Sequence, residues 1–249
     1  MNQIDAFNIK IHPATLIEFV SVIKDNLVQK NRLVQFGVNS ATVNETRDNE
    51  DFRRVINSAD LLNIDGMSVV WALRYLGYKV PERVATPDLA ESVMTMAAEN
   101  NFSVFLFGAT DSVISLCVEN LRKTYPAMRI AGWRSGYYDA KEENSIINQI
   151  NQSGADILLI GISSPKKEFL YDKYRGELKV YYVLGVGGYF DILSGRTRRA
   201  PKWMQNMGFE WIFRLLQEPR RMWRRYLIGN NKFLLTLISE KSRRRKTKS

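Results

Sequence analysis

Apolar residues fall along the chain in two spacings, and these predict two kinds of element. Short, nearly continuous apolar runs are typical of buried strands and occur at residues 32–38, 61–64, 102–108, 128–131, 155–161 and 179–188. Longer stretches carry apolar residues three or four positions apart and predict helices at residues 13–30, 42–58, 67–77, 87–100, 111–125 and 142–152. Because strands that alternate with helices form repeated β-α units, the pattern predicts an α/β fold with a mainly parallel sheet flanked by helices.

The pattern changes after Gly195 and divides the chain into two parts. Beyond that residue, tryptophans are interleaved with arginines, and the apolar spacing predicts two helices that separate at Pro219. Residues 241–249 contain no apolar side chain, so this tail is expected to be disordered. We therefore expect an α/β domain over residues 1–195 and a basic helical appendage over residues 196–249.

The positive charge of the protein belongs to the appendage. The 249 residues carry a formal net charge of +10, but residues 196–249 hold 16 Lys and Arg against three acids, a net of +13, which leaves −3 for residues 1–195. Such a basic segment suits a polyanion, which leaves nucleic acid, an anionic membrane surface and a diphosphate substrate open. No signal peptide is expected at the N-terminus, and no run reaches the roughly 18 apolar residues of a membrane-spanning helix.

Several kinds of site are excluded by what the sequence lacks. One histidine and one cysteine cannot build a His/Cys metal site. Neither a GxxxxGK[ST] phosphate loop nor a GxGxxG turn after the first predicted strand is present, which disfavours a dinucleotide oxidoreductase. No DxD pair is available to hold a divalent ion on a nucleotide-sugar. Bound phosphates would therefore have to be neutralised by arginines, lysines and backbone amides.

The candidate site follows from the predicted sheet, because ligands of parallel α/β sheets bind at the carboxyl ends of the strands. Asn39, Asp65 and Gly108 lie there, as do the loops after Gly161 and Val186. Local sequence leaves Asp65 two roles, that of a helix N-cap and that of a general base. The glycine-rich segment GVGGYFD and the segment GISSPKKE could each bind phosphate or nucleotide, or be plain turns.

Eight segments, in order, resemble one enzyme family. They are NSADLLNIDGMSVVWALRYLG, ERVATPDL, FLFG, GYY, DILLIGISSPKKE, GVGGYFDILSG, RRAPKWMQNMGFEWIFRLLQEPRR and RRYL, which together extend from about residue 32 to residue 238. This set is similar to the WecG/TagA/CpsF glycosyltransferases (glycosyltransferase family 26). The resemblance implies a Rossmann-like catalytic domain with a C-terminal appendage. It also implies an inverting, metal-independent transfer of a sugar from a UDP-sugar to a prenyl-diphosphate-linked acceptor in cell-surface polysaccharide biosynthesis.

The resemblance also assigns roles to residues by position. It implies Asp65 as the general base, with the arginines Arg83, Arg214, Arg221 and Arg224 in the catalytic set. The residues expected to bind substrate are Asn39, Gly66, Gly108, Ser164, Pro165, Lys167, Glu168, Gly187, Gly188 and Asp191. No metal ligand and no cofactor is expected.

Three positions depart from the family pattern. Lys167 stands where a glutamine near the nucleotide base is usual, Gly37 where a threonine is common, and Thr86 where a glycine is usual. The donor sugar is thus left open among N-acetylmannosamine, its uronic acid and a hexose.

The partners implied are a UDP-sugar, a prenyl-diphosphate-linked glycan and the anionic inner face of the cell membrane, where a cytoplasmic protein would bind peripherally. No nucleic-acid partner is expected, and a homo-oligomer is left open. Two other classes remain as alternatives: a nucleic-acid-binding protein that uses the basic appendage, and a nucleotide-sugar epimerase or hydrolase built on the sheet alone.

Overall fold

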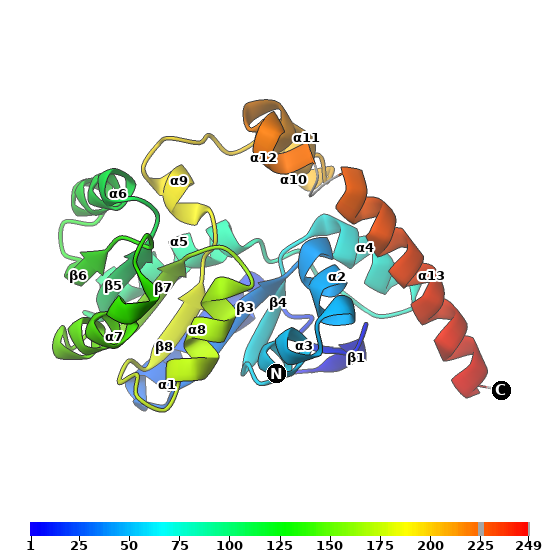
Figure 1. The fold of residues 1–249 in the computed structure, drawn as a ribbon, viewed down its shortest axis with the longest axis horizontal. Helices are drawn as coiled ribbons and strands as arrows, with labels where there is room; N and C mark the ends of the chain where they lie inside the picture. The colour runs from blue at the N-terminus through cyan, green and yellow to red at the C-terminus, as the bar shows by residue number, and fades with distance from the viewer. Residues whose placement is uncertain (224–226, 249) are drawn as a thin grey trace.

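The computed structural model of the protein describes residues 1–223 and 227–248, with the side chains of residues 221, 222 and 245–248 left out. One parallel sheet has the strand order β4-β3-β8-β7-β5-β6 (Figure 1). Its strands are β3 (Leu33–Val38), β4 (Leu61–Ile64), β5 (Ser103–Gly108), β6 (Arg129–Arg134), β7 (Ile157–Gly161) and β8 (Tyr182–Gly185). The prediction of an α/β fold with a parallel, Rossmann-like sheet is therefore confirmed.

Helices cover both faces of this sheet, as continuous apolar strands require. Side chains of β5 alternate between two cores, with Phe105 and Phe107 in one and Val104 and Leu106 in the other. The first core is closed by α2 (Ser40–Asp48), α3 (Glu50–Asn57), α4 (Met67–Tyr75), α7 (Glu143–Gln152) and α8 (Lys166–Tyr174). The second is closed by α1 (Leu16–Val28), α5 (Thr86–Glu99), α6 (Asp111–Thr124) and α9 (Tyr189–Leu193).

Within the α/β domain, local structure differs from the predicted elements in several places. The helix predicted at 42–58 is split, because Asn49 has an extended backbone that ends α2 and its side chain accepts a hydrogen bond from the Phe52 amide to begin α3. An antiparallel hairpin of β1 (Ile4–Ala6) and β2 (Ile9–Ile11), which the apolar pattern did not predict, adds buried side chains to the first core. A short 3-10 helix, η1 (Ala140–Glu142), precedes α7.

The strand order places a ligand crevice at β3 and β8. The chain passes from β3 outward to β4, and all later strands lie on the other side of β3, with β8 beside it. In open α/β sheets such a change of direction opens a crevice outside the carboxyl ends of the strands. Asn39, Asp65 and Val186 directly follow β3, β4 and β8, respectively.

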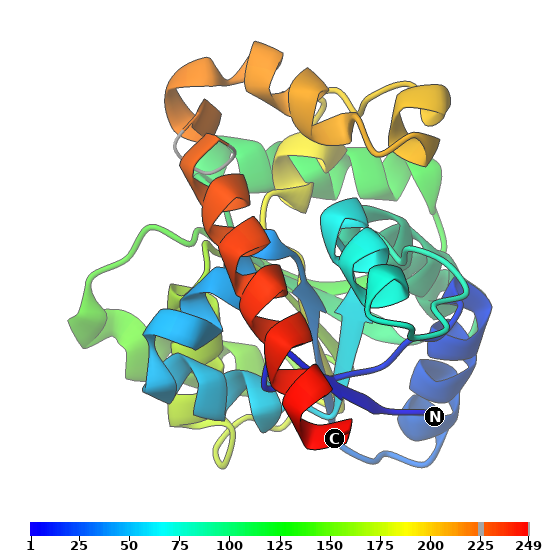
Figure 2. The same ribbon diagram turned by 90° about the vertical axis from the view of Figure 1, so that its right-hand side faces the viewer.

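The appendage folds back over this end of the sheet and then down one side of the domain (Figure 1, Figure 2). It comprises α10 (Lys202–Asn206), α11 (Glu210–Gln217), α12 (Pro219–Trp223) and α13 (Gly229–Lys248). The predicted break at Pro219 is present, but the described residues of the appendage form four helices in place of two. The aromatic ring of Phe233 on α13 is buried against Phe7, and Asn44 donates a 2.8 Å hydrogen bond to the Gly229 carbonyl.

Residues 241–248 of the tail continue α13, whereas the composition predicted disorder. Two arginines hold the helix there: Arg243 donates hydrogen bonds to Glu240 and Asn8, and Arg244 donates a 3.0 Å hydrogen bond to the Leu76 carbonyl. Among the helices described, none combines the length and the apolar character needed to span a bilayer.

Candidate active site

A cleft of about 2020 Å³ lies at the carboxyl ends of the strands, beneath the appendage. Small-molecule sites in proteins commonly occupy roughly 300–1000 Å³, so this cleft has room for two substrates at once. Residues from the ends of β3, β4, β7 and β8 form its floor, and residues of α4, α11 and α13 form its walls. The cleft lies at the edge of the sheet at which the sequence predicted a site.

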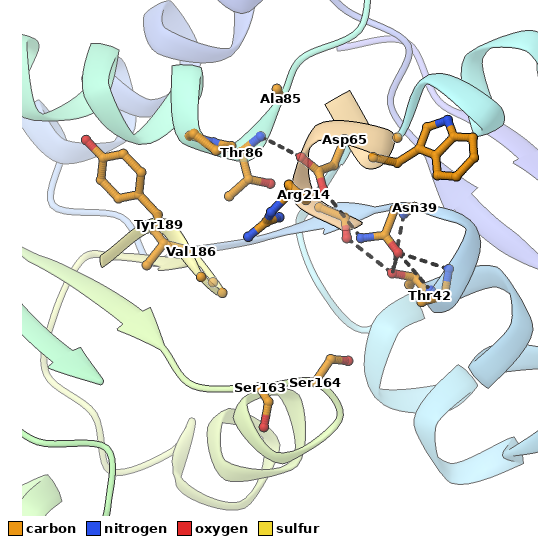
Figure 3. Close-up of a pocket in the computed structure, with 18 of the residues that line it drawn as sticks. Asn39, Thr42, Asp65, Ala85, Thr86, Ser163, Ser164, Val186, Tyr189 and Arg214 are labelled. Carbon is orange, nitrogen blue, oxygen red and sulfur yellow. Dashed lines mark hydrogen bonds between the residues drawn. The ribbon is translucent and has the colours of Figure 1, made fainter. Parts of the chain in front are cut away.

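Asp65 lies on the floor of the cleft, and its carboxylate is held by two donors (Figure 3). Its Oδ1 accepts a 2.7 Å hydrogen bond from the backbone N–H of Thr86, the first residue of α5. Its Oδ2 accepts from the Asn39 side-chain amide at 3.3 Å. The N-cap of α4 is Gly66, without a side-chain cap bond, so Asp65 does not cap the helix that follows it. Its carboxylate instead meets the N-terminus of a different helix, where negative charge is favoured.

Asn39 is oriented for this contact by its place at the start of α2. Its Oδ1 accepts from the amides of Ala41 and Thr42 at 3.0 and 3.3 Å, which makes it the N-cap of the helix. Because both capping hydrogen bonds use the side-chain oxygen of Asn39, its side-chain nitrogen is left to donate to Asp65. One residue therefore both begins α2 and fixes the carboxylate.

Glycines allow the strand ends to come close at two points. A Cβ on Gly66 would lie 3.0 Å from the Cβ of Asn39, so this glycine lets the exits of β3 and β4 approach. Gly108 has a φ of +150°, and a Cβ there would lie 2.5 Å from the backbone of Gly161. Gly108, predicted to bind substrate, is not among the residues that line the cleft, whereas the next residue, Ala109, is.

The loop after β7 and the start of α8 place Ser164, Pro165 and Lys167 at the cleft, with a cis peptide bond between the first two. Lys167 is buried and forms an ion pair with Glu168, which lies outside the lining. The second carboxylate oxygen of Glu168 is buried and has no hydrogen-bond partner among the described residues. The charge of Lys167 is thus neutralised by its neighbour in the first turn of α8.

An arginine of the appendage reaches the turn after β8. A Cβ on Gly188 would lie 3.1 Å from Nη2 of Arg214 and 3.8 Å from Oδ2 of Asp191, so the three residues meet at one point. Gly187 beside them has a φ of +54°, a left-handed conformation suited to glycine. Backbone amides and a guanidinium together are a suitable environment for a phosphate.

Arg83, predicted to act in catalysis, lines the cleft and also ties the appendage to the domain. Its guanidinium lies 3.0 Å from a carboxylate oxygen of Glu210 on α11. Glu210 also lies 3.5 Å from Arg199, which in turn forms an ion pair with Asp88. Burial raises the pKa of the Asp88 carboxyl, but the hydrogen bond and charge of Arg199, with Lys202 and Arg83, outweigh burial and hold the pKa below its usual 3.8.

Eleven of the residues predicted from the sequence line the cleft. They are Asn39, Asp65, Gly66, Arg83, Ser164, Pro165, Lys167, Gly187, Gly188, Asp191 and Arg214. Of the two remaining appendage arginines, Arg224 lies outside the described residues, and the side chain of Arg221 is also not described.

Sequence reasoning missed several residues of the cleft. Thr86 sits beside Asp65, and Arg220 lines the cleft from α12. At the rim, Trp71 and Tyr75 on α4 are 50% and 60% exposed, four residues apart on one face of the helix. Two aromatic residues four positions apart in a predicted helix were the sequence feature from which this rim could have been predicted. The described part of the chain contains no cluster of three or more His, Cys, Asp and Glu side chains able to hold a metal ion.

Comparison with known proteins identifies the family of the chain. Residues 4–247 match the Glycosyl transferase WecG/TagA/CpsF family. The chain belongs to this family and is a glycosyltransferase. A relative from Bacillus spizizenii, an N-acetylglucosaminyldiphosphoundecaprenol N-acetyl-beta-D-mannosaminyltransferase, is 31% identical over 232 residues, which cover 91% of this chain and 86% of the relative.

Proposed function

We propose that the protein transfers a sugar from a UDP-sugar to an acceptor sugar carried on a prenyl diphosphate, with inversion at the anomeric carbon and without a metal. One observation carries this proposal: the Asp65 carboxylate and the Arg214 guanidinium face the same cleft from opposite parts of the chain (Figure 3). The printed activity of the Bacillus spizizenii relative supports the acceptor class. N-acetylmannosamine is accordingly the donor sugar that we favour.

Asp65 would act as the general base. An inverting transfer needs a group that takes the proton of the acceptor hydroxyl as that oxygen attacks the anomeric carbon. Each carboxylate oxygen can accept about two hydrogen bonds, and each oxygen of Asp65 accepts one from the protein. One acceptor position is therefore left on each oxygen for a substrate hydroxyl, while the two protein donors keep the carboxylate from rotating.

Positive charge would stabilise the departing diphosphate. As the glycosidic bond to UDP breaks, negative charge grows on the diphosphate, and fixed donors aimed at it lower the barrier. Arg214 and the amides of Gly187 and Gly188 meet at the exit of β8 and are suited to this task. Arg220 adds a second guanidinium to the cleft wall.

The rim of the cleft is suited to a lipid-linked acceptor at a membrane surface. Trp71 and Tyr75 leave much of their rings exposed there, and Leu234 of α13, which is 53% exposed, also lines the cleft. Lys241 of α13 lies over the Tyr75 ring, and basic residues next to exposed apolar side chains are typical of segments that bind anionic membranes peripherally. We propose that the protein works at the cytoplasmic face of the membrane.

A donor screen tests the proposal. The protein is incubated with UDP-N-acetylmannosamine, its uronic acid form or UDP-glucose, with and without a short-chain prenyl-diphosphate N-acetylglucosamine acceptor, and UDP release is followed. We expect rapid release with one donor that depends on the acceptor and is unchanged by EDTA. Release that is equal without acceptor would indicate a hydrolase, and no release with any donor would reject the proposed function.

A further inference from the structure

Gly37, near the end of β3, and Thr86, at the start of α5, share one small space beside Asp65. A Cβ built on Gly37 would lie 2.4 Å from Oγ1 of Thr86 and 3.0 Å from the Cβ of Asp65. The threonine hydroxyl thus fills the volume that a side chain on the strand would take. The two distances also place this hydroxyl no more than 5.4 Å from the Cβ of the proposed base.

The Thr86 hydroxyl is available to a ligand. Thr86 lines the cleft, and within the described residues its hydroxyl has no hydrogen-bond partner, although the side chain is only 7% exposed. The backbone N–H of the same residue is already used, since it donates to Oδ1 of Asp65. Figure 3 shows Thr86 beside Asp65, with the dashed line marking the hydrogen bond from its backbone N–H.

A hydroxyl can reach this space from either of two positions, residue 86 on α5 or residue 37 on β3. Because the two side chains would occupy one space, only one of the positions can carry a threonine at a time. In this chain the hydroxyl that fills the space belongs to Thr86 on α5. A threonine at position 37 on β3 would place its own side chain in the same space.

We propose that the Thr86 hydroxyl binds the acceptor sugar and positions the hydroxyl that Asp65 deprotonates. This inference rests on the proposed function, because it assumes that the acceptor reaches the base. A free hydroxyl close to the base, in a largely buried setting, is well placed to hold a sugar hydroxyl. A hydrogen bond of this kind contributes about tenfold in affinity or rate when its loss leaves the rest of the site intact.

The first test removes the hydroxyl and keeps the shape. Thr86→Val should lower kcat/KM for the prenyl-diphosphate acceptor about tenfold, Thr86→Ser should keep most of the activity, and the Kd for UDP should stay unchanged in both. Thr95→Val is the matched control, since it makes the same change on α5 at a residue outside the cleft lining. Wild-type values of kcat/KM in Thr86→Val, or an equal loss in Thr95→Val, would overturn the inference.

The second test moves the hydroxyl to the strand. Gly37 has no left-handed φ, so a threonine there meets no backbone strain, but it crowds Oγ1 of Thr86 and, at 3.0 Å, the Cβ of Asp65. Gly37→Thr alone should lower both stability and activity, Thr86→Gly alone should lower activity, and the double variant should recover activity beyond either single one. The Asp65 contact survives Thr86→Gly, because it uses the backbone amide.

The outcomes separate the inference from the proposed function. If the wild-type protein releases no UDP with any donor, the proposed function fails and the inference fails with it. If the wild-type protein is active and the double variant is no better than its parents, the transferase activity stands and the shared role of the two positions is wrong.

Discussion

At the scale of single residues, two hydrogen bonds hold the Asp65 carboxylate in place. A backbone amide of α5 and the side chain of Asn39 hold one oxygen each. Neither contact comes from the helix that follows Asp65 in sequence. The choice between capping and catalysis that local sequence left open is thus resolved in part: the carboxylate does not cap α4, and its use as a base stays a proposal.

Asn39 joins two tasks that one substitution can separate. Aspartate is as good an N-cap as asparagine, but it cannot donate to Asp65 and places a second negative charge beside it. We expect Asn39→Asp to keep the thermal midpoint within a few degrees and to lower turnover at least tenfold. Asn39→Ala should lower turnover as well and cost about 1 kcal/mol of stability through the lost cap. Thermal unfolding and UDP-release rates on both variants check this, and full activity in Asn39→Asp would contradict it.

At the scale of elements, the sequence predicted the parallel sheet and most helix positions because both depend on apolar spacing within a short window. Strand ends then located the site, since carboxyl ends of parallel strands share one edge. Contacts between distant segments could not be predicted in this way. Thr86 donates to Asp65 from 21 residues away, and Glu210 reaches Arg83 from the appendage. The family resemblance pointed to Asp65 and Arg83, but only the three-dimensional structure shows the residues that they contact.

The ion pair between α5 and the appendage predicts a stability change in acid. The folded-state pKa of Asp88 lies below 3.8, while the unfolded chain has the usual value, so the native state binds fewer protons. The contribution of Asp88 to stability is therefore complete above the usual pKa and is lost as the pH falls through the lower folded-state value.

Denaturant unfolding of the wild-type protein and Asp88→Asn from pH 7 down to about pH 3 checks this expectation. The variant should be less stable at neutral pH, and the gap between the two should close below about pH 4. A gap that stays constant over the whole range would show that the Asp88–Arg199 pair does not contribute as a charge pair.

At the scale of the whole molecule, the appendage closes the cleft and adds an apolar surface. Arg214 meets the turn after β8, and α13 buries Phe233 against the domain while Leu235 and Ile238 stay 65% and 63% exposed. These two residues lie on the side of α13 left uncovered by the domain. Exposed leucine and isoleucine on a basic helix are suited to insertion at the surface of an anionic bilayer.

Replacement of this surface should weaken membrane binding without harming the fold. We expect Leu235→Glu with Ile238→Glu to lower co-sedimentation with anionic lipid vesicles at least tenfold, because apolar burial is lost and acidic groups are repelled. The Kd for UDP should stay unchanged. Ile17→Glu, at an 80% exposed position on α1, is the matched control. Equal vesicle binding by the wild-type protein and the double variant would place the membrane contact elsewhere.

The central claim is that Asp65 removes the proton of the acceptor hydroxyl during sugar transfer, and the turnover of Asp65→Asn tests it most directly. Asparagine keeps the shape and can still accept from the Thr86 amide, but it cannot act as a base. With the active donor and a saturating acceptor, the rate of UDP release should fall by about 10²- to 10⁴-fold while the Kd for UDP is unchanged. Turnover close to that of the wild-type protein, in a variant that binds UDP normally, would contradict the role of Asp65.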